Sequence, residues 1–154
     1  MPRSTRFAVA VHALTHLVDA PEPLTSEQLA GCIGTNPVVI RRTLAGLREA
    51  GVVTSARGTG GGWALAHDPA DISLRDVYAA LGERLLQGID VTGPAVRRAP
   101  GGACRIQHAV AGTLDEFLDD AEALLAARLG HITLARLAAG VQRPGPHRHL
   151  PRNA

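Results

Sequence analysis

Lysine is absent from this chain of 154 residues, and arginine supplies all sixteen of its strongly basic side chains. A Walker-type phosphate loop, a Schiff-base enzyme and the ion pair of protein kinases each need a lysine, so the sequence excludes all three. The chain also contains no Gly-x-Ser-x-Gly elbow and no convincing Ser-His-Asp order. We therefore expect a protein that is not an enzyme.

Aromatic residues and cysteines are scarce. Two phenylalanines, one tryptophan and one tyrosine require an aliphatic core, and they disfavour stacking on single-stranded bases. Two cysteines supply neither a four-thiolate zinc or iron–sulfur site nor a disulfide framework. Because no signal peptide and no apolar run of about 20 residues is visible, we expect a cytoplasmic protein that does not engage a membrane.

The net charge of +2 is unevenly distributed. Residues 1–66 contain six arginines and four acidic residues, whereas residues 107–140 contain two arginines and five acidic residues. The last segment, 141–154, contains three arginines and no acidic residue. This asymmetry favours different partners for the two parts of the chain.

Helix signals dominate the first part of the chain. The apolar segment 5–18 predicts a helix that is buried on most sides. Thr25 and Gln28 have the spacing of a capping box and predict a short second helix, which stops at Gly34.

A third helix is expected from Pro37 to Ala50, with Asn36 as its N-cap. Its core-facing stripe consists of Ile40, Leu44 and Leu47. The side chains of Val38, Arg42, Ala45 and Glu49 point away from this stripe, and those of Arg41 and Arg48 lie on one flank of it.

Two extended segments, 52–56 and 63–66, flank the run Arg57-Gly58-Thr59-Gly60-Gly61-Gly62 and predict a β-hairpin with a glycine-rich tip. Ser73 is the expected cap of a further helix over 74–82.

The longest expected helix covers residues 106–130 and would measure about 37 Å. It carries a heptad-like apolar seam made of Val110, Leu114, Phe117, Ala121 and Leu124, for which the alternative is a solvated surface helix. Thr133 is the expected cap of a last helix that ends near Gly140. Residues 88–103 lack periodicity and are expected to form a loop.

Helix, turn, helix and hairpin follow one another in the order of a winged helix-turn-helix. The expected fold class is therefore mostly α with a small β-hairpin. Arginines on the third helix can fork onto guanine edges in a major groove, and the hairpin tip can approach a minor groove. The expected contacts to double-stranded DNA are Thr35, Asn36, Pro37, Val38, Arg41, Arg42, Arg57, Thr59 and Gly60. The alternative is a winged-helix module that binds protein. Its affinity for duplex DNA would be absent or would not change with ionic strength.

Four segments together resemble the bacterial Rrf-type (IscR-, NsrR- and CymR-like) winged-helix regulators. They are Ser4-Thr5-Arg6-Phe7-Ala8-Val9, Thr35-Asn36-Pro37-Val38-Val39-Ile40-Arg41-Arg42, the glycine-rich run 57–62, and Ile72-Ser73-Leu74-Arg75-Asp76-Val77-Tyr78. The resemblance covers most of residues 4–140. It implies a homodimeric transcription factor, often a repressor, whose long C-terminal helix makes the dimer.

On this basis the chain is divided into four parts. Residues 1–82 would form the DNA-binding domain, 83–105 a loop, 106–140 the dimerisation helices, and 141–154 a disordered tail.

The resemblance also frames the sensor chemistry. Iron–sulfur members of the family carry three cysteines in the loop before the long helix, whereas this loop contains only Cys104. The chain is thus more similar to the cluster-free subgroup, and we expect no cofactor. Mixed ligation of a cluster or metal remains an alternative, with Cys104, His108 and His12 as candidate ligands.

The two cysteines allow different interpretations. Cys104 is either a small apolar residue at a helix start, or a thiol whose pKa is lowered by the helix N-terminus and Arg105 and which acts as a redox switch. Cys32 is a second sensor candidate, although its proximity to Leu29 and Ile33 favours a place in the core.

Three other residues carry structural expectations. His12 and His16 lie one turn apart and are expected to be satisfied interior histidines. Trp63 is expected to pack against the base of the hairpin.

Overall fold

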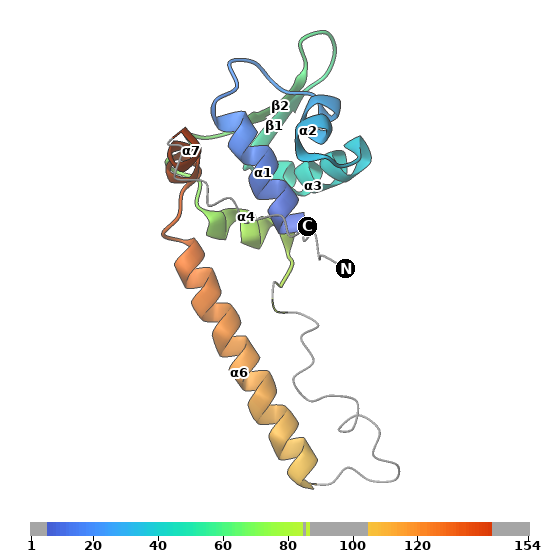
Figure 1. The fold of residues 1–154 in the computed structure, drawn as a ribbon. Helices are drawn as coiled ribbons and strands as arrows, with labels where there is room; N and C mark the ends of the chain where they lie inside the picture. The colour runs from blue at the N-terminus through green and yellow to red at the C-terminus, as the bar shows by residue number, and fades with distance from the viewer. Residues whose placement is uncertain (1–5, 85, 87–104, 143–154) are drawn as a thin grey trace, which may run out of the picture.

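The computed structural model describes residues 6–84, 86 and 105–142 (Figure 1). Its elements are α1 (Arg6–Val18), α2 (Ser26–Ile33), α3 (Pro37–Glu49), β1 (Val53–Ala56), β2 (Gly62–Leu65), α4 (Leu74–Leu81), α6 (Arg105–Leu129) and α7 (Leu134–Gln142). The expected fold class, mostly α with a small β-hairpin, is confirmed. The expected loop 88–103 and the tail from residue 143 lie outside the described residues.

Local capping interactions set the start and the end of α2 and the start of α3. Thr25 Oγ1 accepts a hydrogen bond from Gln28 N at 3.2 Å, and Gln28 Oε1 accepts one from Thr25 N at 2.8 Å. Gly34 ends α2 in the left-handed region, with a φ of 75°. Asn36 Oδ1 then accepts a hydrogen bond from Val38 N at 2.8 Å and begins α3. The helix-turn-helix therefore follows from residues that the sequence already singles out.

The wing is an antiparallel hairpin over residues 53–56 and 62–65. The first strand begins one residue later than expected, and the second begins and ends one residue earlier. Its register places Val53 opposite Leu65 and Ala56 opposite Gly62.

Trp63 fastens the wing to α2. Its side chain is buried, and its indole Nε1 donates a hydrogen bond to Ser26 Oγ at 3.0 Å. Its backbone exchanges two hydrogen bonds with Leu24, N to O at 2.8 Å and O to N at 3.0 Å. The expected packing of Trp63 at the wing base is confirmed.

The core is aliphatic, as the scarcity of aromatic residues predicts. Helix α1 contacts α2, α3, α4, α7 and β2, and so forms the centre of the packed region. The largest fully buried side chains are Leu14, Leu29, Ile40, Leu44, Leu47, Leu134, Val53, Val77 and Thr43. Each buried Val, Leu or Ile stabilises the fold by about 1.5–3 kcal/mol relative to an exposed side chain.

Helix α1 is buried on most sides, as its apolar composition predicts. Only Ala8 and His12, which lie next to each other on one narrow face, are exposed. The expectation that His12 and His16 are satisfied interior histidines is wrong. Their rings stack with centroids 5.1 Å apart, and the buried Nε2 of His16 has no hydrogen-bond partner among the described residues.

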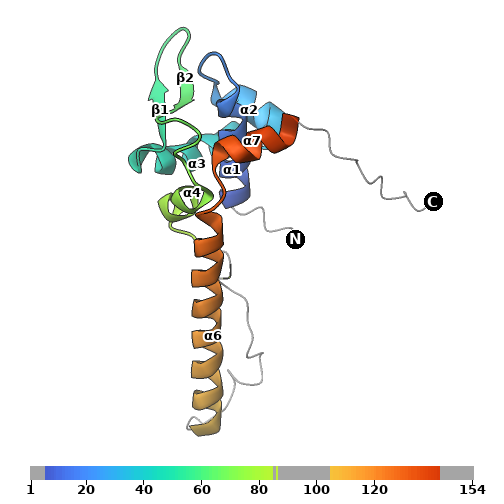
Figure 2. The same ribbon diagram turned by 90° about the vertical axis from the view of Figure 1, so that its left-hand side faces the viewer.

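Helix α6 projects from the packed region as a rod, whereas α7 returns to it (Figures 1 and 2). The return is fixed by three backbone hydrogen bonds: Leu74 N to Ile132 O at 2.8 Å, Leu134 N to Ile72 O at 2.9 Å and Ala135 N to Pro69 O at 3.0 Å. None of the helices in the described ranges combines the length and the apolar character that crossing a bilayer would require.

Candidate nucleic-acid interface

Helix α3 buries its expected stripe and leaves its other face open. Ile40, Leu44 and Leu47 are completely buried, whereas Val38 is 60% exposed and Arg42 is also exposed. The small and charged groups at the start of this helix can therefore reach a ligand without any repacking of the core.

An open crevice of about 380 Å³ lies between α3 and the wing. Its lining residues are Thr25, Ser26, Arg41, Arg48, Ser55, Ala56, Arg57, Gly58, Gly61, Gly62 and Trp63. Three arginines from a helix and a hairpin thus border one space. Such convergence of positive charge attracts an anionic ligand.

Two of these arginines are held by neighbouring side chains. Arg48 Nη1 donates a hydrogen bond to Ser55 Oγ at 3.2 Å, which links α3 to β1. Arg41 Nη1 donates to Glu27 Oε1 at 3.0 Å and forms an ion pair with it. No sequence signal marks Glu27, because its partner is fourteen residues away on another helix.

The wing tip needs its glycines. Gly58 and Gly60 have φ angles of 90° and 79°, which residues with a side chain rarely adopt. A Cβ on Gly61 would lie 2.4 Å from the carbonyl oxygen of Ala56. The tip therefore combines bare backbone with the exposed side chains of Arg57 and Thr59, a combination suited to a narrow groove.

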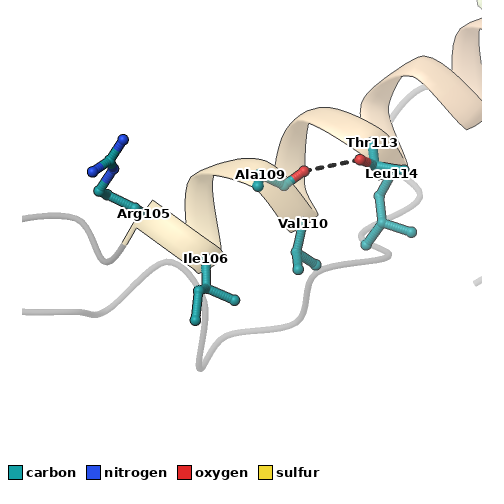
Figure 3. Close-up of a pocket in the computed structure, with 6 residues that line it drawn as sticks. All are labelled: Arg105, Ile106, Ala109, Val110, Thr113 and Leu114. Carbon is teal, nitrogen blue, oxygen red and sulfur yellow. Dashed lines mark hydrogen bonds between the residues drawn. The ribbon is translucent and has the colours of Figure 1, made fainter.

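The expected seam of α6 is exposed in the single chain. Phe117 is 62% and Leu124 67% exposed. Towards the start of the helix, Ile106, Val110 and Leu114 point to the same side (Figure 3). They belong to an open groove of about 450 Å³ whose further lining is Arg105, Ala109 and Thr113. The helix therefore presents an apolar face that the described part of the chain does not cover.

The base of α6 is joined to the packed region by polar contacts. The carboxylate of the buried Glu122 accepts hydrogen bonds from the Tyr78 hydroxyl and, at 2.9 Å, from the backbone N of Leu86. Arg84 pairs with Asp119 one turn away. In the sequence these acids contribute only to the acidic surplus of 107–140, because nothing local indicates partners more than 30 residues away.

The sensor candidates are scattered. Cys32 is exposed on α2, so the interpretation that it packs in the core is wrong; it lies beside the buried face of a short helix, not within it. Cys104 lies outside the described residues. His12 on α1 and His108 on α6 are both exposed.

The candidate ligands that the structure describes do not come together as a metal site. In the described ranges, no three His, Cys, Asp or Glu side chains lie close enough together to hold a metal ion. The described residues therefore do not fit an iron site.

Residues 3–140 match the Rrf2 family, which is described as iron-dependent transcriptional regulators. The chain is 36% identical over 121 residues to YwnA of Bacillus subtilis (strain 168), which is provisionally named an HTH-type transcriptional regulator. This match covers 77% of the chain and 84% of YwnA.

Solved structures show the same fold. A protein provisionally described as DNA-binding has a TM-score of 0.66 at 30% identity, over 86% of this chain and 98% of that protein. A protein from Lactobacillus plantarum, provisionally described as a transcriptional regulator, has a TM-score of 0.69 at 28% identity, over 91% of each chain. The expected winged-helix fold and the resemblance to the Rrf-type regulators are confirmed.

Proposed function

The chain belongs to the Rrf2 family of transcriptional regulators, and on that premise we propose that it is a homodimeric repressor that binds specific double-stranded DNA. Each protomer inserts α3 into a major groove and the wing tip, residues 57–61, into a neighbouring minor groove. Under this proposal the chain has no enzymatic activity and acts in the cytoplasm, where the DNA is.

The observation that carries this proposal is the crevice between α3 and the wing. Helix α3 contributes Arg41 and Arg48 to its lining, and the wing contributes Arg57. Different local sequence signals specify these two elements. Because the chain has no lysine, every strongly cationic contact to a phosphate or a base must come from arginine.

The dimer is supported by the exposed apolar face of α6. Phe117 and Leu124 continue the line of Val110 along more than half of the helix. An apolar seam with heptad spacing is the surface that pairs of helices bury between them. Under this proposal residues 1–82 bind DNA, and residues 106–140 provide the dimer.

The test uses duplexes that the full-length protein selects from a random-sequence library. Arg41→Ala and Arg42→Ala should each weaken binding to the selected duplex by about 1–3 kcal/mol where a bidentate base contact is lost, and Arg57→Ala should weaken it too. Arg136→Ala is the matched control, because this exposed arginine lies on α7, on the other side of α1 from α3 (Figure 1).

Two outcomes would count against the proposal. Unchanged binding in all three variants would show that α3 and the wing are not the DNA-reading surface. Failure of the wild-type chain to bind duplex DNA at any ionic strength would instead favour a module that binds protein.

A thiol response is the second part of the proposal. Cys32 is exposed on α2, which packs directly against α3, and Cys104 precedes α6. Peroxide would oxidise a reactive thiolate to a sulfenic acid and would itself be reduced to water. Mass spectrometry after mild peroxide, together with DNA binding by Cys104→Ser and Cys32→Ser, tests this: unmodified cysteines and unchanged binding would refute it.

Repression is tested separately. In cells that carry a reporter behind the selected sequence, the wild-type chain should lower transcription, and Arg41→Ala should restore it. Higher transcription with the wild-type chain would identify an activator.

A further inference from the structure

The contact between α2 and α3 at Glu27 suggests more than a surface ion pair. Glu27 lies in the first turn of α2, and its Oε1 is 3.0 Å from Arg41 Nη1. Both side chains are largely exposed, Arg41 at 55% and Glu27 at 63%. An exposed pair of this kind contributes at most about 1 kcal/mol to stability, so its main consequence is for what Arg41 can bind.

We propose that Glu27 is a specificity-determining residue, which holds Arg41 for a base edge and keeps it from the DNA backbone. This inference rests on the DNA-binding function proposed above. Within it, Glu27 is a positioning residue that acts through Arg41.

The geometry leaves Arg41 able to read a base. A guanidinium has five N–H donors, and Glu27 engages only Nη1. The edge made by Nε and Nη2 has no hydrogen-bond partner among the described residues, so it can fork onto two acceptors, such as the O6 and N7 of guanine. Because the carboxylate already restrains the long side chain, less conformational entropy is lost when that fork forms.

The charge of Glu27 disfavours contacts between Arg41 and the phosphates of the DNA backbone. Arg41 and Glu27 together are neutral, so they give little attraction for a phosphate, and the carboxylate repels one. Arg42, Arg48 and Arg57 have no ion-pair partner among the described residues, so no acid offsets their positive charges. Sequence-independent attraction therefore comes more from those three than from Arg41, whose main contribution is discrimination.

Glu27→Gln separates the two roles. It retains the size of the side chain and removes the charge, which weakens the restraint on Arg41 and leaves its positive charge available to phosphates in non-specific complexes. Binding to a scrambled duplex should tighten about threefold or more at low salt, and the slope of its log affinity against log salt should steepen by about one. Binding to the selected duplex should tighten less or weaken, so the ratio of the two affinities falls.

A double-mutant cycle ties this effect to Arg41. In an Arg41→Ala background, Glu27→Gln should no longer change the ratio, because no guanidinium remains to be restrained. Glu49→Gln is the matched control, since it removes the same charge from the far end of α3, about 12 Å along the helix from Arg41. It should leave the ratio unchanged.

Two results would overturn the inference. One is an equal change in both affinities on Glu27→Gln, which would reduce Glu27 to a general repulsive charge. The other is a fall in the ratio that persists in the Arg41→Ala background. Both differ from failure of the proposed function, in which the wild-type chain would not distinguish the selected duplex from the scrambled one. Circular dichroism melting of each variant verifies that the fold is intact.

Discussion

The packed region and the rod α6 differ in how far they bury their apolar residues. In the packed region, Leu14, Leu44 and Leu47 are completely buried among α1, α3 and their neighbours. On α6, Phe117 and Leu124 stay mostly exposed. The sequence nevertheless predicts comparable apolar stripes on α3 and on α6. The packed region buries its apolar stripes within a single chain, whereas α6 keeps an apolar face that the described residues do not cover.

This contrast separates two tasks. The packed region fixes the geometry of α3 and the wing, because caps, a buried tryptophan and an aliphatic core hold them in place. The rod contributes little to that geometry beyond its base at Glu122. Substitutions in the first region should therefore change folding or DNA contact, and substitutions on the rod should change association.

The largest expected effect is on association through the seam. Phe117→Asp combined with Leu124→Asp introduces charges into the apolar face of both copies, and should weaken dimerisation by roughly 5 kcal/mol. Sedimentation equilibrium measures this, with circular dichroism to show that each chain stays folded. His108→Asp, about 180° away around α6, is the control and should leave the dimer intact. Equal weakening by both variants would mean that association does not depend on this face.

A smaller effect is expected on folding of the packed region. Leu44→Ala leaves a cavity at a completely buried position and should lower the free energy of unfolding by about 2–5 kcal/mol. Leu124→Ala removes the same atoms from an exposed position on α6. At protein concentrations where the monomer dominates, urea unfolding should show a loss below about 1 kcal/mol for that variant. Similar losses in both would contradict the contrast between the two regions.

The smallest effect is expected at the wing tip. Gly61→Ala places a Cβ against the Ala56 carbonyl and must displace the tip, so we expect DNA affinity to fall by about 1–2 kcal/mol with little change in stability. Gly31→Ala is the control, because a Cβ there meets no atom within 4 Å and alanine suits the interior of α2. Unchanged affinity in Gly61→Ala would show that the wing tip does not touch the duplex.

The sequence predicts the parts of the molecule that local rules determine. Thr25, Asn36 and Ser73 begin helices where their capping patterns indicate, and the glycine run turns the hairpin within one residue of the expected bounds. These signals act over three or four residues, so they can be recognised without a fold.

The sequence did not predict the contacts between distant segments. Glu27 meets Arg41, and Tyr78 meets Glu122, only after helices pack, and neither pair has a periodic or spaced pattern. The placement of Cys32 was wrong for a related reason. Helix α2 is so short that its sequence pattern does not distinguish a buried residue from an exposed residue beside it.

In the proposed complex, two copies of the chain, each with α3 and a wing, bind one duplex symmetrically. This symmetry can be tested by hydroxyl-radical footprinting of the full-length protein on its selected duplex. We expect two equivalent protected half-sites, related by a near-palindrome and centred about one helical turn, or a multiple of it, apart. A single protected half-site without two-fold symmetry, at protein concentrations that saturate the duplex, would contradict it.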